Sequence, residues 1–203
     1  MLKIRDIDEA KTIFKGWDNN HMWDTPSLDF LEHTKKKARE TLKLASYLLN
    51  KIENTHELDD ISIASMWVIT KCYYSMFFLV EYLLGLDGKK IPEGTQDTHK
   101  TIYLAFLYYY LIKNSELEQD SKKIITTSRM SKALVLFKDS QDESLVLQRI
   151  KKSASDLKSQ KEQRHKFTYR ENRPAELYEA KKSFEKAREF REIIEEYIQT
   201  KKV

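Results

Sequence analysis

Residues 61–80 are ISIASMWVITKCYYSMFFLV, twenty positions with one charge, at Lys71. Apolar side chains occur on nearly every face of a helix built from this segment, which predicts a helix covered by neighbours on most sides. A membrane span is disfavoured, because a lysine at the centre of a bilayer is costly and hydroxyl residues interrupt the segment. We expect the helix to run to about Leu84, to end at Gly85 and to form the centre of a helical bundle.

A long helix is predicted before this central one. Thr25 can cap it, and Pro26 suits its first turn, where the missing N–H has no partner to lose. Its apolar residues recur at helical spacing and form one stripe: Leu31, Ala38, Leu42, Ala45, Leu49 and Ile52. Residues 1–24 are predicted to be an N-terminal aromatic-rich extension, in which a short helix and a loop place aromatic side chains on the bundle.

Further helices are predicted after a glycine-containing break that follows the central helix. They cover residues 97–113, 129–137 and 143–166, and Pro174 opens a last helix. The last helix has an apolar stripe of Leu177, Phe184, Ala187, Phe190, Ile194 and Tyr197. With four glycines and three prolines in 203 residues, a turn-rich all-β fold is disfavoured. We predict an all-α protein, an up-and-down bundle of four to five long helices over residues 25–203 with a short N-terminal extension.

Charge and cysteine content narrow the class of protein. The formal net charge is +4, but residues 149–173 alone contain nine basic and three acidic residues, a net +6. Such a window is more often a solvated helix face than a binding site, and it is also where an anionic partner would bind. The single cysteine, Cys72, lies in an apolar run, which excludes a disulfide framework. The charged N-terminus lacks a signal-peptide core, and we expect a cytoplasmic protein outside the membrane.

Three places in the sequence can carry chemistry, none of them with a motif for a metal or a cofactor. Lys71 must reach solvent, pair with a carboxylate or face a polar cleft, because burying an unpaired ammonium costs several kcal/mol. Tyr74 beside it is expected in the core or at that cleft. His99 is expected to cap the third helix, to lie on the surface or to face the cleft. Arg164 and Tyr169, five residues apart, can present a guanidinium fork and a phenol to one ligand.

Taken in order, these segments resemble the HEPN domain family, helical proteins named for higher eukaryotes and prokaryotes nucleotide-binding. The likeness rests on Tyr-Tyr-Ser-Met-Phe at residues 73–77, on His99 at the start of the next helix and on the Arg-x4-Tyr turn from Arg164 to Tyr169. A last helix with Ala and Phe follows that turn. The resemblance covers about residues 30–198.

The resemblance implies a homodimer in which two arginine turns meet at a cleft that faces RNA or a nucleotide. Many members of the family are metal-independent endoribonucleases, often toxins paired with an antitoxin of nucleotidyltransferase fold. Their motif has a histidine where this chain has Tyr169, and a tyrosine that titrates near ~10 is a poor general base at neutral pH. The resemblance therefore supports binding better than catalysis.

Carried over by the resemblance, Arg164 would hold the scissile phosphate, with Tyr169 in place of the histidine. The ligand contacts would come from Lys71, Tyr74, His99, His165, Lys166 and Arg170. A non-catalytic interaction module, either an adaptor or an antitoxin-like dimer, is the alternative from a different class. An enzyme that uses Arg164, Lys71 and His99 on a small phosphorylated metabolite is a third hypothesis.

Overall fold

The chain is helical over most of the residues that the computed structural model describes, which are 4–54, 61–113, 128–143 and 176–201. The elements are α1 (Ile4–Asn19), α2 (Leu28–Asn54), α3 (Ile61–Leu86), α4 (Thr98–Leu107), the π-helix η1 (Tyr108–Ile112), a helix over residues 128–143 and α7 (Leu177–Lys201). Within these ranges the only extended pairing is an isolated bridge between Asp24 and Lys90. The predicted all-α class is confirmed.

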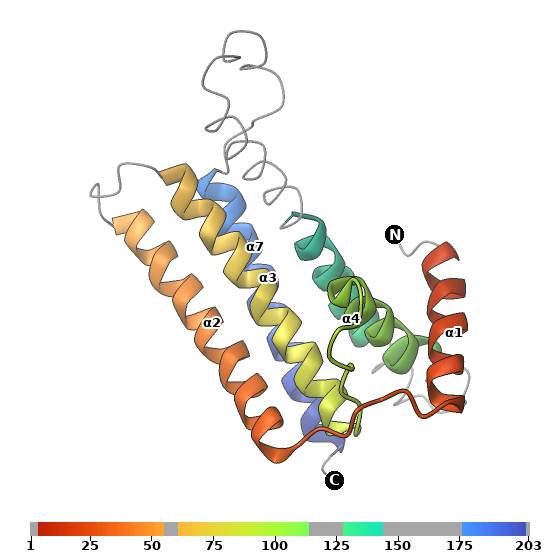
Figure 1. The fold of residues 1–203 in the computed structure, drawn as a ribbon. Helices are drawn as coiled ribbons and strands as arrows, with labels where there is room; N and C mark the ends of the chain where they lie inside the picture. Colours follow the sequence, from red (N-terminus) through yellow and green to blue (C-terminus); the bar gives the residue numbers. More distant parts are fainter. Residues whose placement is uncertain (1–3, 55–60, 114–127, 144–175, 202–203) are drawn as a thin grey trace, which may run out of the picture.

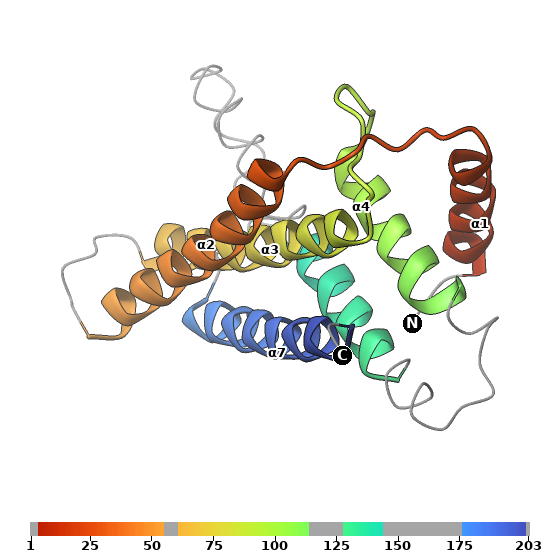
Figure 2. The ribbon, with the colours of Figure 1, turned by 90° about the horizontal axis from the view of Figure 1, so that it is seen from below.

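α3 is the central helix of the bundle. It contacts α2 along most of its length, α7 along another face and α4 on a third, and α1 lies at the far edge, beyond α4 (Figures 1 and 2). Its buried side chains point to several sides, among them Val68, Tyr73, Phe77, Leu79 and Tyr82. The prediction of a covered central helix is therefore confirmed. In the part of the chain that the structure describes, no helix combines the length and hydrophobicity needed to cross a membrane.

α2 packs on α3 through the predicted stripe, of which Ala38, Leu42, Ala45, Leu49 and Ile52 are buried. Its start differs from the prediction by two residues, because Ser27 caps it: the Ser27 Oγ accepts the Phe30 N–H at 3.1 Å. Thr25 and Pro26 precede the helix.

Gly85 does not end the central helix, which continues to Leu86. The glycine instead permits a close approach between α2 and α3. A Cβ at this position would lie 2.6 Å from Cδ2 of Leu31, a distance at which the neighbour has to move. The absence of a side chain serves helix packing here rather than helix termination.

α7 and the helix over residues 128–143 pack on each other and on α3. Ala187, Phe190 and Ile194 of the predicted stripe are buried, and the Phe190 ring lies 5.9 Å from that of Phe137. The described part of this helix extends beyond the predicted end at residue 137, and its Asp139 and Glu143 contact Lys186 of α7. There Glu143 accepts hydrogen bonds from the Ser183 hydroxyl at 2.9 Å and the Lys186 ammonium at 2.7 Å. The basic helix predicted over 143–166 lies, beyond its first residue, outside the described residues, as does Pro174.

The N-terminal extension is a helix and a loop that place aromatic rings on the bundle, as predicted. Phe14 of α1 is fully buried and stacks on Trp23 with ring centroids 5.6 Å apart. Trp17 meets Trp23 edge-to-face at 4.8 Å. Both tryptophans thus close over Phe14 and join α1 to the loop that leads to α2.

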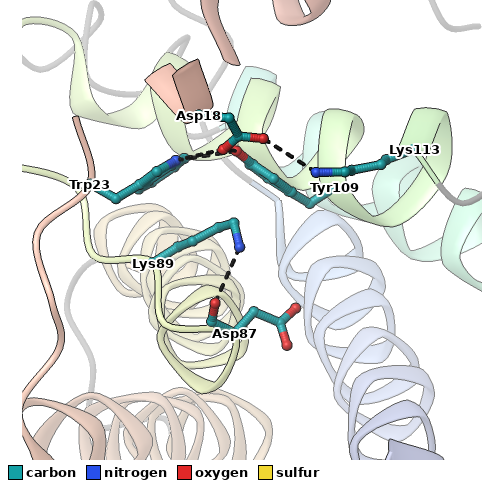
Figure 3. A network of polar contacts seen from close by, with 6 residues as sticks. All are labelled: Asp18, Trp23, Asp87, Lys89, Tyr109 and Lys113. Atoms are coloured by element: carbon teal, nitrogen blue, oxygen red, sulfur yellow. Dashed lines mark hydrogen bonds and ion pairs between the residues drawn. The ribbon is translucent and has the colours of Figure 1, made fainter. Parts of the chain in front are cut away.

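A polar network fastens this extension to η1 (Figure 3). The Asp18 carboxylate accepts hydrogen bonds from the Tyr109 hydroxyl, from Trp23 Nε1 at 3.2 Å and from Lys113 Nζ at 3.3 Å. Burial alone would raise the pKa of Asp18, but these hydrogen bonds and the Lys113 charge bring it below the ordinary value. Lys89 covers the other side of the Tyr109 ring, 4.7 Å from its centroid. The network has a structural role, because its polar groups already contact one another and hold α1 and the following loop against η1.

Candidate functional site

Three of the predicted ligand-binding residues lie close together on one side of α3. Tyr74 and His99 meet edge-to-face with ring centroids 5.8 Å apart, and Lys71 lies one helical turn before Tyr74. All three are partly exposed. The other predicted site residues lie outside the described residues: Arg164, His165, Lys166, Tyr169 and Arg170.

These residues belong to a longer aromatic surface of α3, which Lys37 of α2 and His99 of α4 border. We call it the open face, and its members are Trp67, Lys71, Tyr74 and Phe78 of α3, Lys37 of α2 and His99 of α4. Trp67 is 38% exposed, and the Tyr74 and Phe78 rings stack with centroids 6.0 Å apart. Aromatic rings spaced along one helix thus remain accessible to a flat ligand.

Two lysines place their charges over the rings of the open face. Lys71 Nζ lies 5.4 Å from the Trp67 ring centroid, and Lys37 Nζ lies 5.2 Å from that of Phe78. Lys71 reaches solvent, which is the first of the three environments predicted for it. Its ammonium lies over the partly exposed indole of Trp67. Neither lysine forms an ion pair with a carboxylate among the described residues.

His99 is neither the cap of α4 nor a plain surface residue, two of the environments predicted for it. Asp97 caps the helix by accepting the Lys100 N–H. The His99 ring instead lies 4.7 Å from that of Phe77, and its Nδ1 is 2.6 Å from the Tyr73 hydroxyl oxygen. Burial lowers the pKa of His99, although the Asp97 charge opposes the change. The imidazole is therefore neutral at pH 7.

The contact between Tyr73 and His99 bears on which nitrogen of the imidazole carries the proton. Burial raises the pKa of Tyr73, so its hydroxyl keeps its proton and can donate it to Nδ1 of His99. In that tautomer the neutral ring bears its hydrogen on Nε2. His99 can thus donate to a phosphate oxygen or a base edge.

Glu81 extends the open face toward a small pocket that the sequence did not single out. The pocket has a volume of about 230 Å³, and its lining includes Glu81, Lys89, Lys90 and Thr98. Burial raises the pKa of Glu81 to about 7, and the charge of Lys37 lowers it only in part. A lone acid in the apolar second half of α3 was the sequence signal that could have indicated this site.

The described residues contain no group of three or more His, Cys, Asp or Glu side chains that could hold a metal ion. The chain matches no protein-family model, no curated protein and no solved structure in the comparisons made.

Proposed function

We propose that this chain is a HEPN-like protein that binds RNA or a nucleotide, as a homodimer, and uses the open face of α3 as part of its binding surface. One observation carries the proposal: Tyr74 is partly exposed, is bordered by the Phe78 and His99 rings, and lies between Lys37 and Lys71, which form no ion pair within 4 Å among the described residues. Aromatic platforms flanked by cations are the usual device for binding single-stranded nucleic acid.

Each component has a physical role in this proposal. A base that stacks on an exposed aromatic ring contributes about 1–3 kcal/mol and does so for any base. Lys37 and Lys71 neutralise phosphate charge and release counterions, which makes binding weaken with salt. The Nε2–H of His99 adds a neutral donor beside the stacking ring. The +6 window at residues 149–173 would supply further positive charge.

The order of the elements also supports the proposal. α3 contains the Tyr-Tyr-Ser-Met-Phe segment at residues 73–77, and His99 in the first turn of α4 lies against it. α7 follows with its stripe of Ala and Phe and packs on the same central helix. The proposed likeness to the HEPN family rests on these segments in this order.

RNA binding is tested by fluorescence anisotropy with a labelled single-stranded RNA over a salt series. The double variant Lys71→Gln/Tyr74→Leu is expected to raise Kd about tenfold or more, because it removes one stacking ring and one cation. The matched control is Lys51→Gln/Tyr47→Leu, a second lysine–tyrosine pair on the outer side of α2, with Nζ 6.0 Å from the ring centroid. Equal binding by both double variants, or binding insensitive to salt, would overturn the proposal.

Cleavage of RNA is a second readout of the same proposal. We propose a weak, metal-independent endoribonuclease of the toxin–antitoxin type, whose activity depends on Arg164 and persists in EDTA. Loss of cleavage in Arg164→Ala with RNA binding retained supports the catalytic part. Cleavage that EDTA abolishes, or that Arg164→Ala leaves unchanged, contradicts it.

A non-catalytic interaction module is the second candidate. It is favoured by large apolar side chains that remain exposed on α2 and α3, with Leu44 at 42% and Trp67 at 38%. An adaptor or an antitoxin-like dimer would bury them against a protein, for instance a partner of nucleotidyltransferase fold. Light scattering on the purified chain and on its mixture with such a partner tests this candidate. A complex that forms with wild type and is lost with Trp67→Ser, in a protein that binds no RNA, would favour it over RNA binding.

A further inference from the structure

A second cavity lies on the opposite side of α2 from the open face. It has a volume of about 590 Å³ and is formed where the first half of α2, the second half of α3 and the last turns of α7 meet. Lys35 borders this cavity, whereas Lys37 reaches the open face, and residues two apart on a helix point in nearly opposite directions. The cavity is therefore separate from the surface proposed to bind RNA.

The floor of the cavity is apolar. Ala38, Leu79 and Ile198 line it, and the Tyr82 ring is 8% exposed at its edge. The Ser75 hydroxyl on the floor already donates to the Ala38 carbonyl oxygen at 2.8 Å. The floor thus offers a mainly apolar surface, with the polar ends of Tyr82 and Gln199 in its lining.

The rim of the cavity has an excess of positive charge. Its cations are Lys35, Lys36, Arg39 and Arg191, and its acids are Glu32 and Glu195.

Several of the donors on this rim are available to a ligand. Arg191 donates to Glu195 through Nε at 2.7 Å, and Arg39 donates to Glu40 through Nε at 2.9 Å. Among the described residues neither contact uses the terminal NH2 groups of these guanidiniums, and Lys36 has no ion-pair partner there. The guanidinium NH2 groups of Arg39 and Arg191 and the ammonium of Lys36 therefore border the same apolar floor.

We propose that this cavity binds a small organic anion: a carboxylate, phosphate or sulfonate group attached to an apolar body. The anionic group would accept hydrogen bonds from the Arg39 and Arg191 NH2 groups and from Lys36, since guanidinium forks match the geometry of such oxygens. The apolar body would cover Ala38, Leu79 and other residues of the floor. A cavity of this volume, with an apolar lining and a few converging polar groups, has the size and composition of a small-molecule site.

The proposal is tested with anilinonaphthalene sulfonate, an aromatic anion that fluoresces when it binds an apolar surface. The variant Lys36→Gln/Arg191→Gln removes two rim charges. Its matched control, Lys43→Gln/Arg188→Gln, removes one lysine and one arginine from the same two helices. Arg188 is paired four residues on with Glu192, as Arg191 is with Glu195, but neither control residue lines the cavity. We expect the Kd of the rim variant to rise about tenfold or more and that of the control to stay at the wild-type value.

Displacement of the fluorescent anion identifies the apolar body. Phenyl phosphate or dodecanoate should displace it at concentrations where inorganic phosphate does not, and whichever is stronger indicates an aromatic or an aliphatic ligand. Unchanged affinity in the rim variant, equal weakening in the control, or displacement by inorganic phosphate at the same concentrations would overturn the proposal. Far-ultraviolet circular dichroism of each variant verifies that the bundle is intact.

Discussion

Glu81 lines the pocket between α3, α4 and the loop that joins them. Replacing it with glutamine tests how much the buried carboxyl group lowers the free energy of unfolding. Burial raises the pKa of Glu81 to about 7 from an ordinary value of 4.5. At about 1.36 kcal/mol for each pH unit, this pKa difference corresponds to a loss of about 3 kcal/mol in the free energy of unfolding when Glu81 is charged. Because the side chain keeps some exposure, we expect about 2–3 kcal/mol in practice.

The sign of the effect follows from the protonation of the two states. Below about pH 4.5 the carboxyl group is neutral in both the folded and the unfolded chain, and burial carries no charge penalty. Between about pH 4.5 and 7 the unfolded chain loses the proton while the folded protein keeps it, so stability falls as the pH rises. Above about pH 7 the folded protein bears the full cost. Glu81→Gln, which is never charged, should therefore be more stable than wild type by about 2–3 kcal/mol near pH 8 and nearly equal to it near pH 4.

Urea unfolding at both pH values measures this difference. The control is Glu93→Gln, because Glu93 lines the same pocket but its side chain is 92% exposed. Its stability should follow that of wild type at both pH values. A stabilisation by Glu81→Gln that is the same at both pH values, or a loss of stability near pH 8, would refute the reasoning.

Three further substitutions test the packing and the hydrogen bonds. Tyr73→Phe removes the hydroxyl that contacts His99 Nδ1 and should lower the free energy of unfolding in urea by about 1–3 kcal/mol; an unchanged value would contradict this hydrogen bond. Gly85→Ala places a Cβ against Leu31 and should cost about 1–3 kcal/mol in the same assay, whereas Gly16→Ala, with open space around it, should be neutral or slightly stabilising. Asp18→Asn should destabilise the protein at neutral pH, and its difference from wild type should vanish as the pH falls through the lowered pKa of Asp18, because the stability that this carboxylate contributes is lost there.

The helices that could be predicted from sequence are those whose pattern is local. The segment at residues 61–80 is apolar on almost every face, and a helix with that property must be central. The stripes on α2 and α7 needed only a spacing of three and four residues. Boundaries were harder, because Thr25 and Ser27 are both good caps and only the tertiary structure decides between them.

The site was predictable only in part, because most of it depends on contacts between distant segments. Lys71 and Tyr74 were indicated by their positions in an apolar helix. The environment of His99 was not, since Tyr73 and Phe77 reach it from another helix. Residues 139–143 are polar and resemble a turn in sequence, yet they are helical, and Glu143 pairs with α7. The spacing of residues within one segment cannot predict such contacts between distant segments.

The central claim is that RNA lies on the open face of α3, and photo-crosslinking tests it most directly. RNA containing iodouridine is irradiated in complex with the protein, and the modified peptides are identified by mass spectrometry. We predict adducts on Trp67 or Tyr74, both on the open face. Adducts confined to other peptides, such as those with the exposed Tyr47 or Tyr178, would contradict the claim.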